Sequence, residues 1–444
     1  MDNRPYSITF SRSQGRTKGW VRVISRLLAF LLFCIVPSAT AVSAQVVVVR
    51  AGHLVDPAKA TVADNQVILI RDGKIVEIGP GVTAPPGASQ VDLSQQWVLP
   101  GLVDAHTHIT MNLPVNPPGG SLWENKLVHE STGFRVARGL HNAQILLNAG
   151  FLALRDVGNN GDYGDIAVRK AIEAGWFQGP TIIGSGKIIA EFGGQSHDLS
   201  PEAGEFWKYE YLDADNPEEI RKAVHQNIFY GAGVIKLVTD NNPYFYTVDD
   251  IRAAVDEAHN AGLKVAVHVS GGKAADNVIE GGADSLEHGF ELTDDQLRRM
   301  KEKGIFLVGT DFPLEHMIAF GSMTSLNANT AAEMDIRRLA AAHRIGVKMA
   351  FGSDVVVELP GENRADMCFD FLKVWERAGV PPADTLRAWT TDGYELLGIA
   401  NKQGPIAPGL AADMIAVPEN PLKNIYILRK VDFVMKDGQI IRRP

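Results

Sequence analysis

The chain is poor in cysteine and has no apolar run long enough to serve as a permanent membrane anchor. Its 444 residues include two cysteines, Cys34 and Cys368, and we expect Cys34 to be removed with an N-terminal segment. An intrachain disulfide is then impossible, which excludes a disulfide framework as the basis of the fold. The composition, 45% hydrophobic and 21% charged, is typical of a globular protein with a large core.

Positive charge is also scarce, except at the N-terminus. The net charge is −9, yet residues 1–44 hold six basic residues and one acidic residue, so the remainder carries −14. An acidic body argues against nucleic acid or an anionic membrane as a partner. A small-molecule substrate and a homo-oligomeric state are what we expect instead.

The first 44 residues have the order of a secretory signal. Basic residues precede a short apolar run from Leu27 to Val36, and small residues follow up to Ala44. A permanent span needs about 20 apolar residues, more than this run supplies. We therefore predict cleavage near Ala44 and a secreted or periplasmic protein without a lasting anchor; an uncleaved anchor is the alternative.

The two ends of the chain are rich in predicted β-strands, whereas the middle has a different pattern of predicted secondary structure. Residues 45–99 contain short β segments with turns such as RDGK (71–74), and residues 405–444 repeat the pattern with KDGQ (436–439). We predict one small β-sandwich domain built from both termini; two unrelated edge sheets are the alternative.

Between these ends, residues 100–404 alternate apolar strands with helical segments, several of which close on glycine. The strands are eight in number, which predicts an α/β fold with a (β/α)8 TIM-type barrel. After the first strand, within 97–111, they are expected at 151–158, 181–189, 233–240, 264–271, 285–290, 305–312 and 348–355. Helices are expected at 141–150, 165–175, 217–233, 248–262 and 332–346.

Polar side chains with metal-binding chemistry lie at the ends of these strands. They are His106, His108, Lys236, His268, His288 and Asp354. The carboxyl ends of barrel strands meet at one face, and residues two apart in a strand point the same way. Each residue alone has an ordinary alternative, such as a core histidine or a helix N-cap. Together, imidazoles and a carboxylate predict a site for divalent metal.

This ordered set resembles the amidohydrolase superfamily, as do the passages GLVDAHTH (101–108) and APGLAADMIAV (407–417). Within it, the chain is similar to imidazolonepropionase-like and Xaa-Pro dipeptidase-like metal hydrolases. The resemblance implies two divalent metal ions, expected to be zinc. One would be held by His106, His108 and Asp354, and the other by His268 and His288.

The resemblance also implies that Lys236 is N6-carboxylated and bridges both metals together with a hydroxide. Asp354 would take the proton of that hydroxide and return it to the leaving nitrogen. One-metal deaminases of the superfamily lack this lysine and carry glutamate where this chain has Gly271. We therefore predict hydrolysis of a peptide-like amide, in a dipeptide or an N-acyl amino acid and including ochratoxin-like aromatic amides. Hydrolysis of a cyclic amide or lactone, deamination, and a non-catalytic binding protein are the alternatives.

Several polar residues are candidates for binding the substrate. They are Gln195, His197, Tyr244, Tyr246 and Arg364. The stretch FGGQSHD (192–198) is similar to a dipeptidase loop, although relatives commonly carry Gly-Gly-His where this chain has Gly-Gly-Gln. The tyrosines offer hydroxyls or ordinary lid packing, and Arg364 offers a bidentate clamp or a surface ion pair. The long loop over 112–127 is predicted to shape a partly apolar pocket.

Overall fold

The computed structural model describes residues 46–114, 129–159, 161–196, 199–319 and 325–444. The predicted signal segment lies outside the described residues, as does most of the predicted substrate loop over 112–127. None of the helices in the described part is long and apolar enough to cross a membrane.

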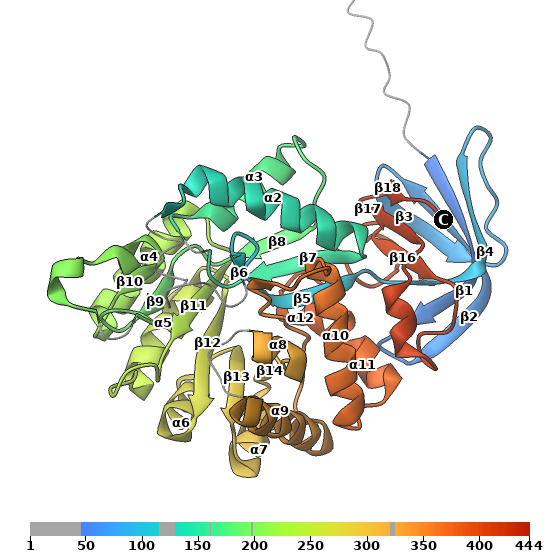
Figure 1. Ribbon diagram of the computed structural model, residues 1–444. Helices are drawn as coiled ribbons and strands as arrows, with labels where there is room; N and C mark the ends of the chain where they lie inside the picture. Colours follow the sequence, from blue (N-terminus) through green and yellow to red (C-terminus); the bar gives the residue numbers. More distant parts are fainter. Residues whose placement is uncertain (1–45, 115–128, 160, 197–198, 320–324) are drawn as a thin grey trace, which may run out of the picture. The chain divides into compact units, whose positions relative to one another are not determined.

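Strands from both ends of the chain form one seven-stranded sheet, drawn in blue and red in Figure 1. In spatial order they are β18 (Gln439–Arg442), β17 (Phe433–Lys436), β16 (Met414–Val417), β4 (Ser89–Leu99), β1 (Val46–Asp56), β2 (Thr61–Arg71) and β3 (Lys74–Gly79). Antiparallel pairing of β16 with β4 joins the two ends. The alternative of two unrelated edge sheets is therefore wrong. Hydrogen bonds join all seven strands into a single sheet, and Ile75 N–H donating to Leu410 O also brings β3 beside the segment that leads into β16.

This terminal sheet has its own hydrophobic core. Alternate residues of β1, namely Val47, Val49 and Ala51, are buried together with Phe433 and Met435 of β17. Alternation with a period of two places these side chains on one face of the sheet. The two ends of the chain are thus held together by apolar packing as well as by strand pairing.

The middle of the chain is α/β, as predicted, with parallel strands in two groups. One group has the order β5 (Leu102–Thr107), β7 (Phe151–Asp156) and β8 (Thr181–Gly184). The other has the order β10 (Tyr211–Asp213), β9 (Ile188–Ala190), β11 (Val234–Val238), β12 (Lys264–Gly271), β13 (Ser285–Glu291) and β14 (Phe306–Val308). A short pair, β6 (Leu113–Pro114) and β15 (Val357–Glu358), lies apart from both.

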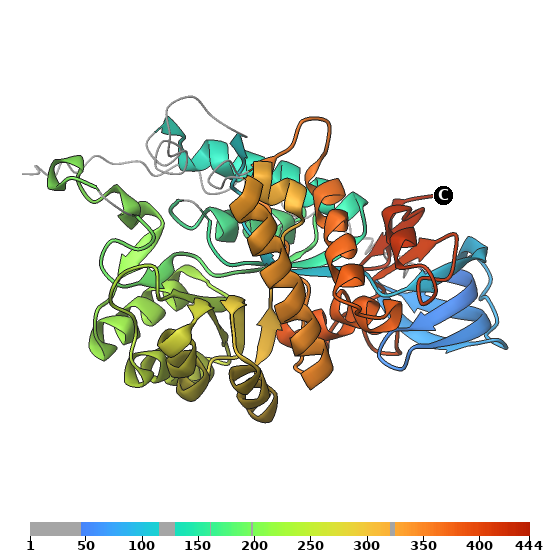
Figure 2. The ribbon, with the colours of Figure 1, turned by 60° about the horizontal axis from the view of Figure 1, so that its bottom comes forward.

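Helices follow these strands along the chain and pack against one another in sequence order, as Figures 1 and 2 show for α4 to α7. The α-helices are α2 (Thr132–Asn148), α3 (Gly164–Glu173), α4 (Pro217–Tyr230), α5 (Val248–Asn260), α6 (Gly272–Gly281), α7 (Asp294–Lys303), α8 (Leu314–Ala319), α9 (Ser325–Ile345), α10 (Arg364–Arg377), α11 (Pro382–Ala388) and α12 (Thr391–Leu396). Short 3-10 helices are η2 (Pro201–Ala203), η3 (Phe206–Tyr209) and η4 (Ile425–Arg429). The five helices expected from the sequence are confirmed.

Helix α4 shows how the sequence sets these boundaries. The side chain of Asn216 accepts the Glu219 N–H at 3.1 Å, and Pro217 occupies the first turn, where its missing N–H costs nothing. Gly231, with φ 102°, ends the helix in the left-handed conformation that glycine adopts most easily.

The eighth predicted strand, over 348–355, is not a regular strand. It forms a single bridge between Met349 and Leu307, and the N–H of Ala105 donates to Phe351 O at 2.8 Å. The chain then passes close to its neighbours at Gly352, where a Cβ would lie 2.4 Å from Val308 Cγ1 and 2.6 Å from His106 Cβ. This tight passage requires glycine and brings the next residues beside β5.

Candidate metal centre

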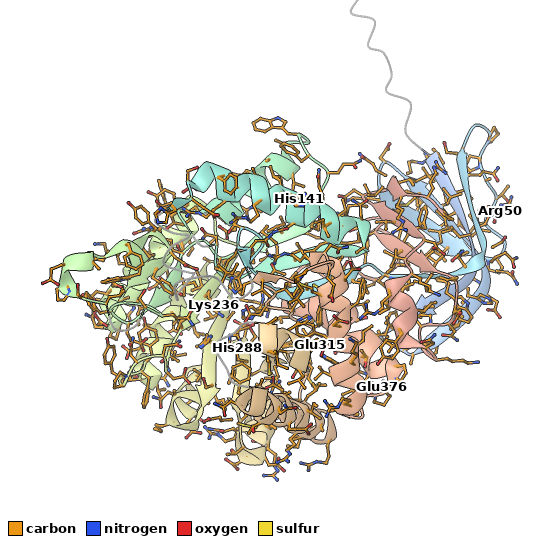
Figure 3. All side chains as sticks on the ribbon, viewed as in Figure 1. Arg50, His141, Lys236, His288, Glu315 and Glu376 are labelled. Carbon is orange, nitrogen blue, oxygen red and sulfur yellow. The ribbon has the colours of Figure 1, made fainter. Side chains whose placement is uncertain are left out.

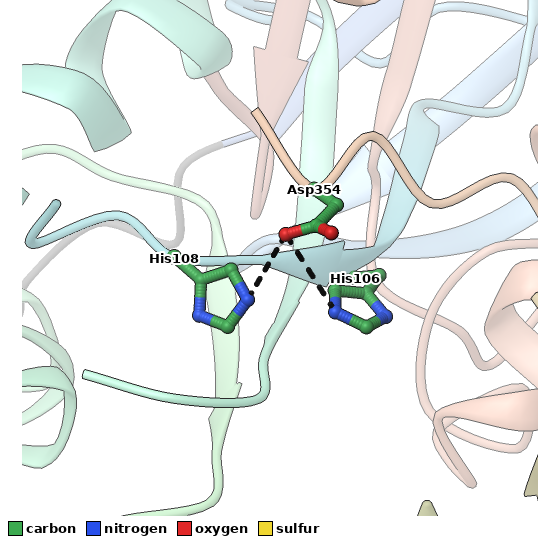
Figure 4. A group of neighbouring side chains, drawn as sticks. All are labelled: His106, His108 and Asp354. Carbon is green, nitrogen blue, oxygen red and sulfur yellow. Dashed lines mark ion pairs between the residues drawn. The ribbon is translucent and has the colours of Figure 1, made fainter. Parts of the chain in front are cut away.

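Three of the predicted ligands lie together at the carboxyl end of β5. The Nε2 atoms of His106 and His108 are 3.9 Å and 3.1 Å from Asp354 Oδ1 (Figure 4). One ligand atom from each residue lies within 4.8 Å of the other two. Ligands about 2.0–2.2 Å from a zinc ion would have separations of this order. The N–H of Asp354 also donates to His106 O at 2.7 Å, which fixes the two segments to each other.

Hydrogen bonds at the Nδ1 atoms, which point away from Asp354, orient the imidazoles of His106 and His108. His106 Nδ1 lies 2.7 Å from Glu287 Oε2, and His108 Nδ1 lies 2.7 Å from Gly158 O. Both partners are acceptors, so each Nδ1 carries the proton and each Nε2 presents a lone pair toward Asp354. His288 Nδ1 lies 2.8 Å from Thr310 Oγ1, a hydroxyl that can either donate or accept. This is the arrangement that metal-binding histidines need, and the residues present fit a divalent ion.

Lys236 and the other two histidines come from neighbouring strands of the six-stranded group (Figure 3). In the β11–β12 register, Lys236 pairs with Ala266 and Val238 pairs with His268. Residues two apart share a face, so Lys236 and His268 point to the same side. The ring centroids of His268 and His288 are 4.3 Å apart, and those of His288 and His106 are 4.9 Å apart. The four imidazoles thus form one continuous group.

Unusual backbone conformations aim two of these side chains. His288 has φ 68° and Asp354 has φ 49°, both in the left-handed region that residues other than glycine seldom adopt. In a regular strand Glu287 and His288 would point to opposite faces. Such strain is typical of functional sites and persists only where the surroundings enforce it.

Burial, together with the nearby charge of Lys236, lowers the pKa of His106 to about 4 and that of His268 to about 3, so both imidazoles are neutral. Burial alone would also lower the pKa of His108, but the adjacent Asp354 carboxylate raises it. Burial likewise lowers the pKa of Lys236 to about 8. Burial alone would raise the pKa of Asp354, but the neighbouring His106 and His108 lower it. A neutral imidazole and an ionised carboxylate are the states that bind metal.

Two buried charged residues in this region were missed by the sequence analysis. Glu287 and Arg155 are 0% and 1% exposed, and Arg155 Nη2 donates to Glu287 Oε1 at 2.7 Å. The sequence feature that could have identified them is a charged residue within an apolar predicted strand. Arg155 lies in FLALRDVG (151–158), and Glu287 lies in SLEHGF (285–290). Such residues are rarely buried unless they are paired.

Arg364 has partners that differ from the expected surface ion pair. It is buried, and its guanidinium donates to the carbonyls of Met111 and Val355 and to Asn112 Oδ1 at 2.6 Å. A surface ion pair does not match these contacts, and Arg364 also lines a cavity of about 390 Å³. Met111 lies three residues after His108, and Val355 directly follows Asp354. The hydrogen bonds of Arg364 therefore link the two segments that carry the ligand triad.

Replacing Arg364 by methionine should therefore destabilise the protein by about 2–4 kcal/mol, because buried carbonyls lose charged hydrogen-bond donors. Urea unfolding of wild type and variant measures this difference. The exposed Arg337, replaced in the same way, is the control and should change stability by less than about 0.5 kcal/mol. If Arg364→Met lowered the free energy of unfolding by less than about 1 kcal/mol, this would contradict the role of Arg364 in linking the two segments.

The remaining candidates for substrate binding differ in their burial and in their hydrogen-bond partners. Tyr246 is buried, and its hydroxyl donates to Ala214 O at 2.8 Å, which matches the packing alternative. Gln195 Oε1 accepts from the Tyr211 hydroxyl at 2.7 Å. Tyr244 is 49% exposed, with its hydroxyl 3.1 Å from Phe192 O. His197 lies outside the described residues.

A cavity of about 400 Å³ lies beside Tyr244. Its lining includes Phe192, Leu199, Trp207, Asn242 and Tyr244. Phe192 follows β9, and Asn242 and Tyr244 follow β11, which carries Lys236. Because β9 and β11 are adjacent and parallel, the cavity lies at the same edge of the sheet as the end of the Lys236 strand.

A second group of potential ligands consists of His316, Glu362 and Asp370. His316 Nε2 lies 3.4 Å from Asp370 Oδ2. However, Asp370 is already paired with Arg429 at 2.5 Å and Lys373 at 2.9 Å. The positive charges of Arg429 and Lys373 already neutralise the Asp370 carboxylate and disfavour binding of a metal cation there. The group around Asp354 is therefore the better metal site.

Comparisons with known proteins agree with this geometry. Residues 97–441 match the model of the Amidohydrolase family. Ochratoxinase of Aspergillus niger is 28% identical over 446 residues, covering 90% of this chain and 88% of that protein. Imidazolonepropionase of Kosmotoga olearia is 23% identical, covering 86% of this chain and 92% of that protein.

A solved structure of a Xaa-Pro dipeptidase with bound methionine in the active site is 26% identical, with a TM-score of 0.78 over 89% of this chain and 100% of that one. The resemblance expected from the sequence is confirmed in these relatives. Because the family model covers most of the sequence, from the end of β4 to β18, the chain belongs to the amidohydrolase family and is a hydrolase of carbon–nitrogen bonds.

Proposed function

We propose that this chain is a binuclear metal-dependent amidohydrolase that cleaves a peptide-like amide in a dipeptide or an N-acyl amino acid. The observation that carries the proposal is the convergence of His106, His108 and Asp354, whose ligand atoms lie within 4.8 Å of one another. His268 and His288 extend the same group from the neighbouring strands. This donor set suits two zinc ions.

The proposal includes a closed eight-membered barrel. Segment 348–355 supports it, because Ala350 N–H donates to Leu307 O on β14 and Phe351 O accepts from Ala105 on β5. On the other side, Gly233 N–H donates to Gly184 O at 2.8 Å and links β11 with β8. These contacts would join the two groups of strands into a ring with all ligands at one mouth.

The chain's own residues have distinct roles in this proposal. The neutral amine of Lys236 would add to carbon dioxide, forming an N–C bond and releasing one proton, and the resulting carbamate would supply two anionic oxygens as metal ligands. Divalent ions bound there would polarise the scissile carbonyl and lower the pKa of a nearby water. Asp354 Oδ1 faces His108, which leaves Oδ2 to take the proton of the attacking water and return it to the leaving nitrogen.

The cavity beside Tyr244 is a suitable place for an apolar acyl group of the substrate. Exposed aromatic surface is available there, since Phe192 is 51% exposed and its ring lies 5.4 Å from that of Trp207. The side-chain NH2 group of Gln195, whose Oε1 accepts from Tyr211, is the nearby donor for the substrate's carboxylate. The similarity to ochratoxinase makes an aromatic acyl group the first to test.

Replacing Phe192 by alanine should raise KM for an N-benzoyl amino acid by about 5–30-fold, because about 1–2 kcal/mol of apolar contact is lost. The kcat for this substrate and the KM for the N-acetyl analogue should change little. Steady-state kinetics with both substrates measures the difference, with Phe229→Ala on the outer face of α4 as the control. Equal effects on the two substrates would contradict the placement.

The test of the proposed function is a substrate panel with the metal-loaded full chain. The panel contains Xaa-Pro dipeptides, N-acetyl and N-benzoyl amino acids, ochratoxin A, a cyclic amide and a lactone. Release of a free amino acid that stops when a chelator removes the metal supports the proposal. Turnover of only the cyclic substrates, or a folded protein that never binds metal, contradicts it.

A further inference from the structure

A buried polar network around Glu287 lies beside the candidate metal centre. Glu287 Oε2 contacts His106 Nδ1 at 2.7 Å. Its other oxygen, Oε1, accepts from Arg155 Nη2 at 2.7 Å and from the Ser285 hydroxyl at 2.5 Å. Both carboxylate oxygens therefore have partners, although the side chain is fully buried.

Arg155 holds this carboxylate in place from the opposite group of strands. Its Nη1 donates to Ser285 Oγ at 2.9 Å, and its Nε donates to Ala105 O at 2.6 Å. Arg155 lies on β7, Glu287 on β13 and Ala105 on β5, directly before His106. A buried ion pair is tolerated only when further hydrogen bonds satisfy both groups, and here they do.

The Nδ1 atom of His106 is within hydrogen-bond distance of an ionised carboxylate, 2.7 Å from Glu287 Oε2, whereas the carboxylate nearest to His288 Nδ1 is that of Asp354, at 3.9 Å. The corresponding partner is the Gly158 carbonyl for His108 and the Thr310 hydroxyl for His288. A carboxylate partner fixes the tautomer and makes the opposite nitrogen a stronger electron donor. Compared with His108 and His288, His106 thus has the stronger hydrogen-bond partner for holding a metal ion.

We infer that Glu287, held by Arg155, is a positioning residue that sets the affinity of the metal position formed by His106, His108 and Asp354. This inference rests on the proposed function, because it assumes two metal positions. Among the described residues, the imidazole to which the Glu287 carboxylate is hydrogen-bonded is that of His106, whereas its charge acts on His268 only through space. Its removal should therefore weaken one position selectively, whereas a loss of general packing would weaken both.

The experiment is a zinc titration of the metal-free full chain against a chromogenic chelator, which resolves two dissociation constants. For Glu287→Gln we expect one Kd to rise about 10–100-fold while the other stays within a factor of about three. Asp413→Asn is the matched control, since it breaks a buried acid–lysine pair in the terminal sheet, with Asp413 Oδ2 3.1 Å from Lys436 Nζ. It should leave both constants unchanged.

Equal weakening of both positions, or no weakening, in a folded Glu287→Gln protein would overturn the inference. If that variant does not fold, Ser285→Ala removes one hydrogen bond to Glu287 and should weaken the same position by a smaller factor. No selective change in Ser285→Ala would also overturn it. A wild-type chain that binds fewer than two zinc ions would instead refute the proposed function.

Discussion

Replacing Asp354 by asparagine is expected to lower kcat by about 10³-fold or more while leaving the fold intact, because the amide cannot accept the proton from the attacking water. Asparagine keeps the shape of the side chain and its position beside His108 Nε2, 3.1 Å away. Steady-state hydrolysis of the preferred substrate measures the loss, and circular dichroism checks the fold.

The control for this variant is Asp370→Asn, which alters a more deeply buried aspartate beside the imidazole of His316. It should keep most of the wild-type kcat. If Asp354→Asn retained more than about a tenth of kcat, Asp354 would not be the proton carrier.

Removing the amine of Lys236 should also lower the catalytic activity strongly. Lys236 lies in the fully buried strand VIKLV (234–238), where a charged ammonium is poorly solvated. Lys236→Ala is expected to lower kcat/KM by about 100-fold or more, because the two-oxygen bridge between the ions is lost. Added propionate, a small two-oxygen anion that fits the vacated volume, should restore part of the activity.

The exposed Lys402, replaced by alanine, is the control and should show neither effect. Zinc content per chain should fall in Lys236→Ala and stay constant in Lys402→Ala. Full zinc content and unchanged kcat/KM in Lys236→Ala would contradict a bridging role.

The sequence predicted the parts of this protein that follow from periodicity and strand ends. Alternating strands and helices indicated the α/β middle, and the i, i+2 spacing of His106 and His108 indicated that their side chains converge. The β-rich ends predicted a shared domain, because hairpin turns recur on both sides of the middle. Each of these features depends on neighbours in the chain.

Other features depend on tertiary packing and left no readable pattern. The segment around Gly352 is irregular because His106 and Val308 leave no room for a side chain. The positive φ of His288 is imposed by its surroundings, and the ion pair of Arg155 with Glu287 joins residues 132 positions apart. Arg364 was expected to face substrate or solvent, but its guanidinium donates to backbone carbonyls from two loops.

Anomalous diffraction at the zinc edge from crystals of the zinc-loaded protein tests the central claim most directly. Two peaks per chain are predicted, about 3.5–4 Å apart, with density for a carboxylated Lys236 between them. One peak should lie within about 2.2 Å of ligand atoms of His106, His108 and Asp354, and the other within that distance of His268 and His288. A single peak, or zinc bound only at His316 and Asp370, would contradict the binuclear centre.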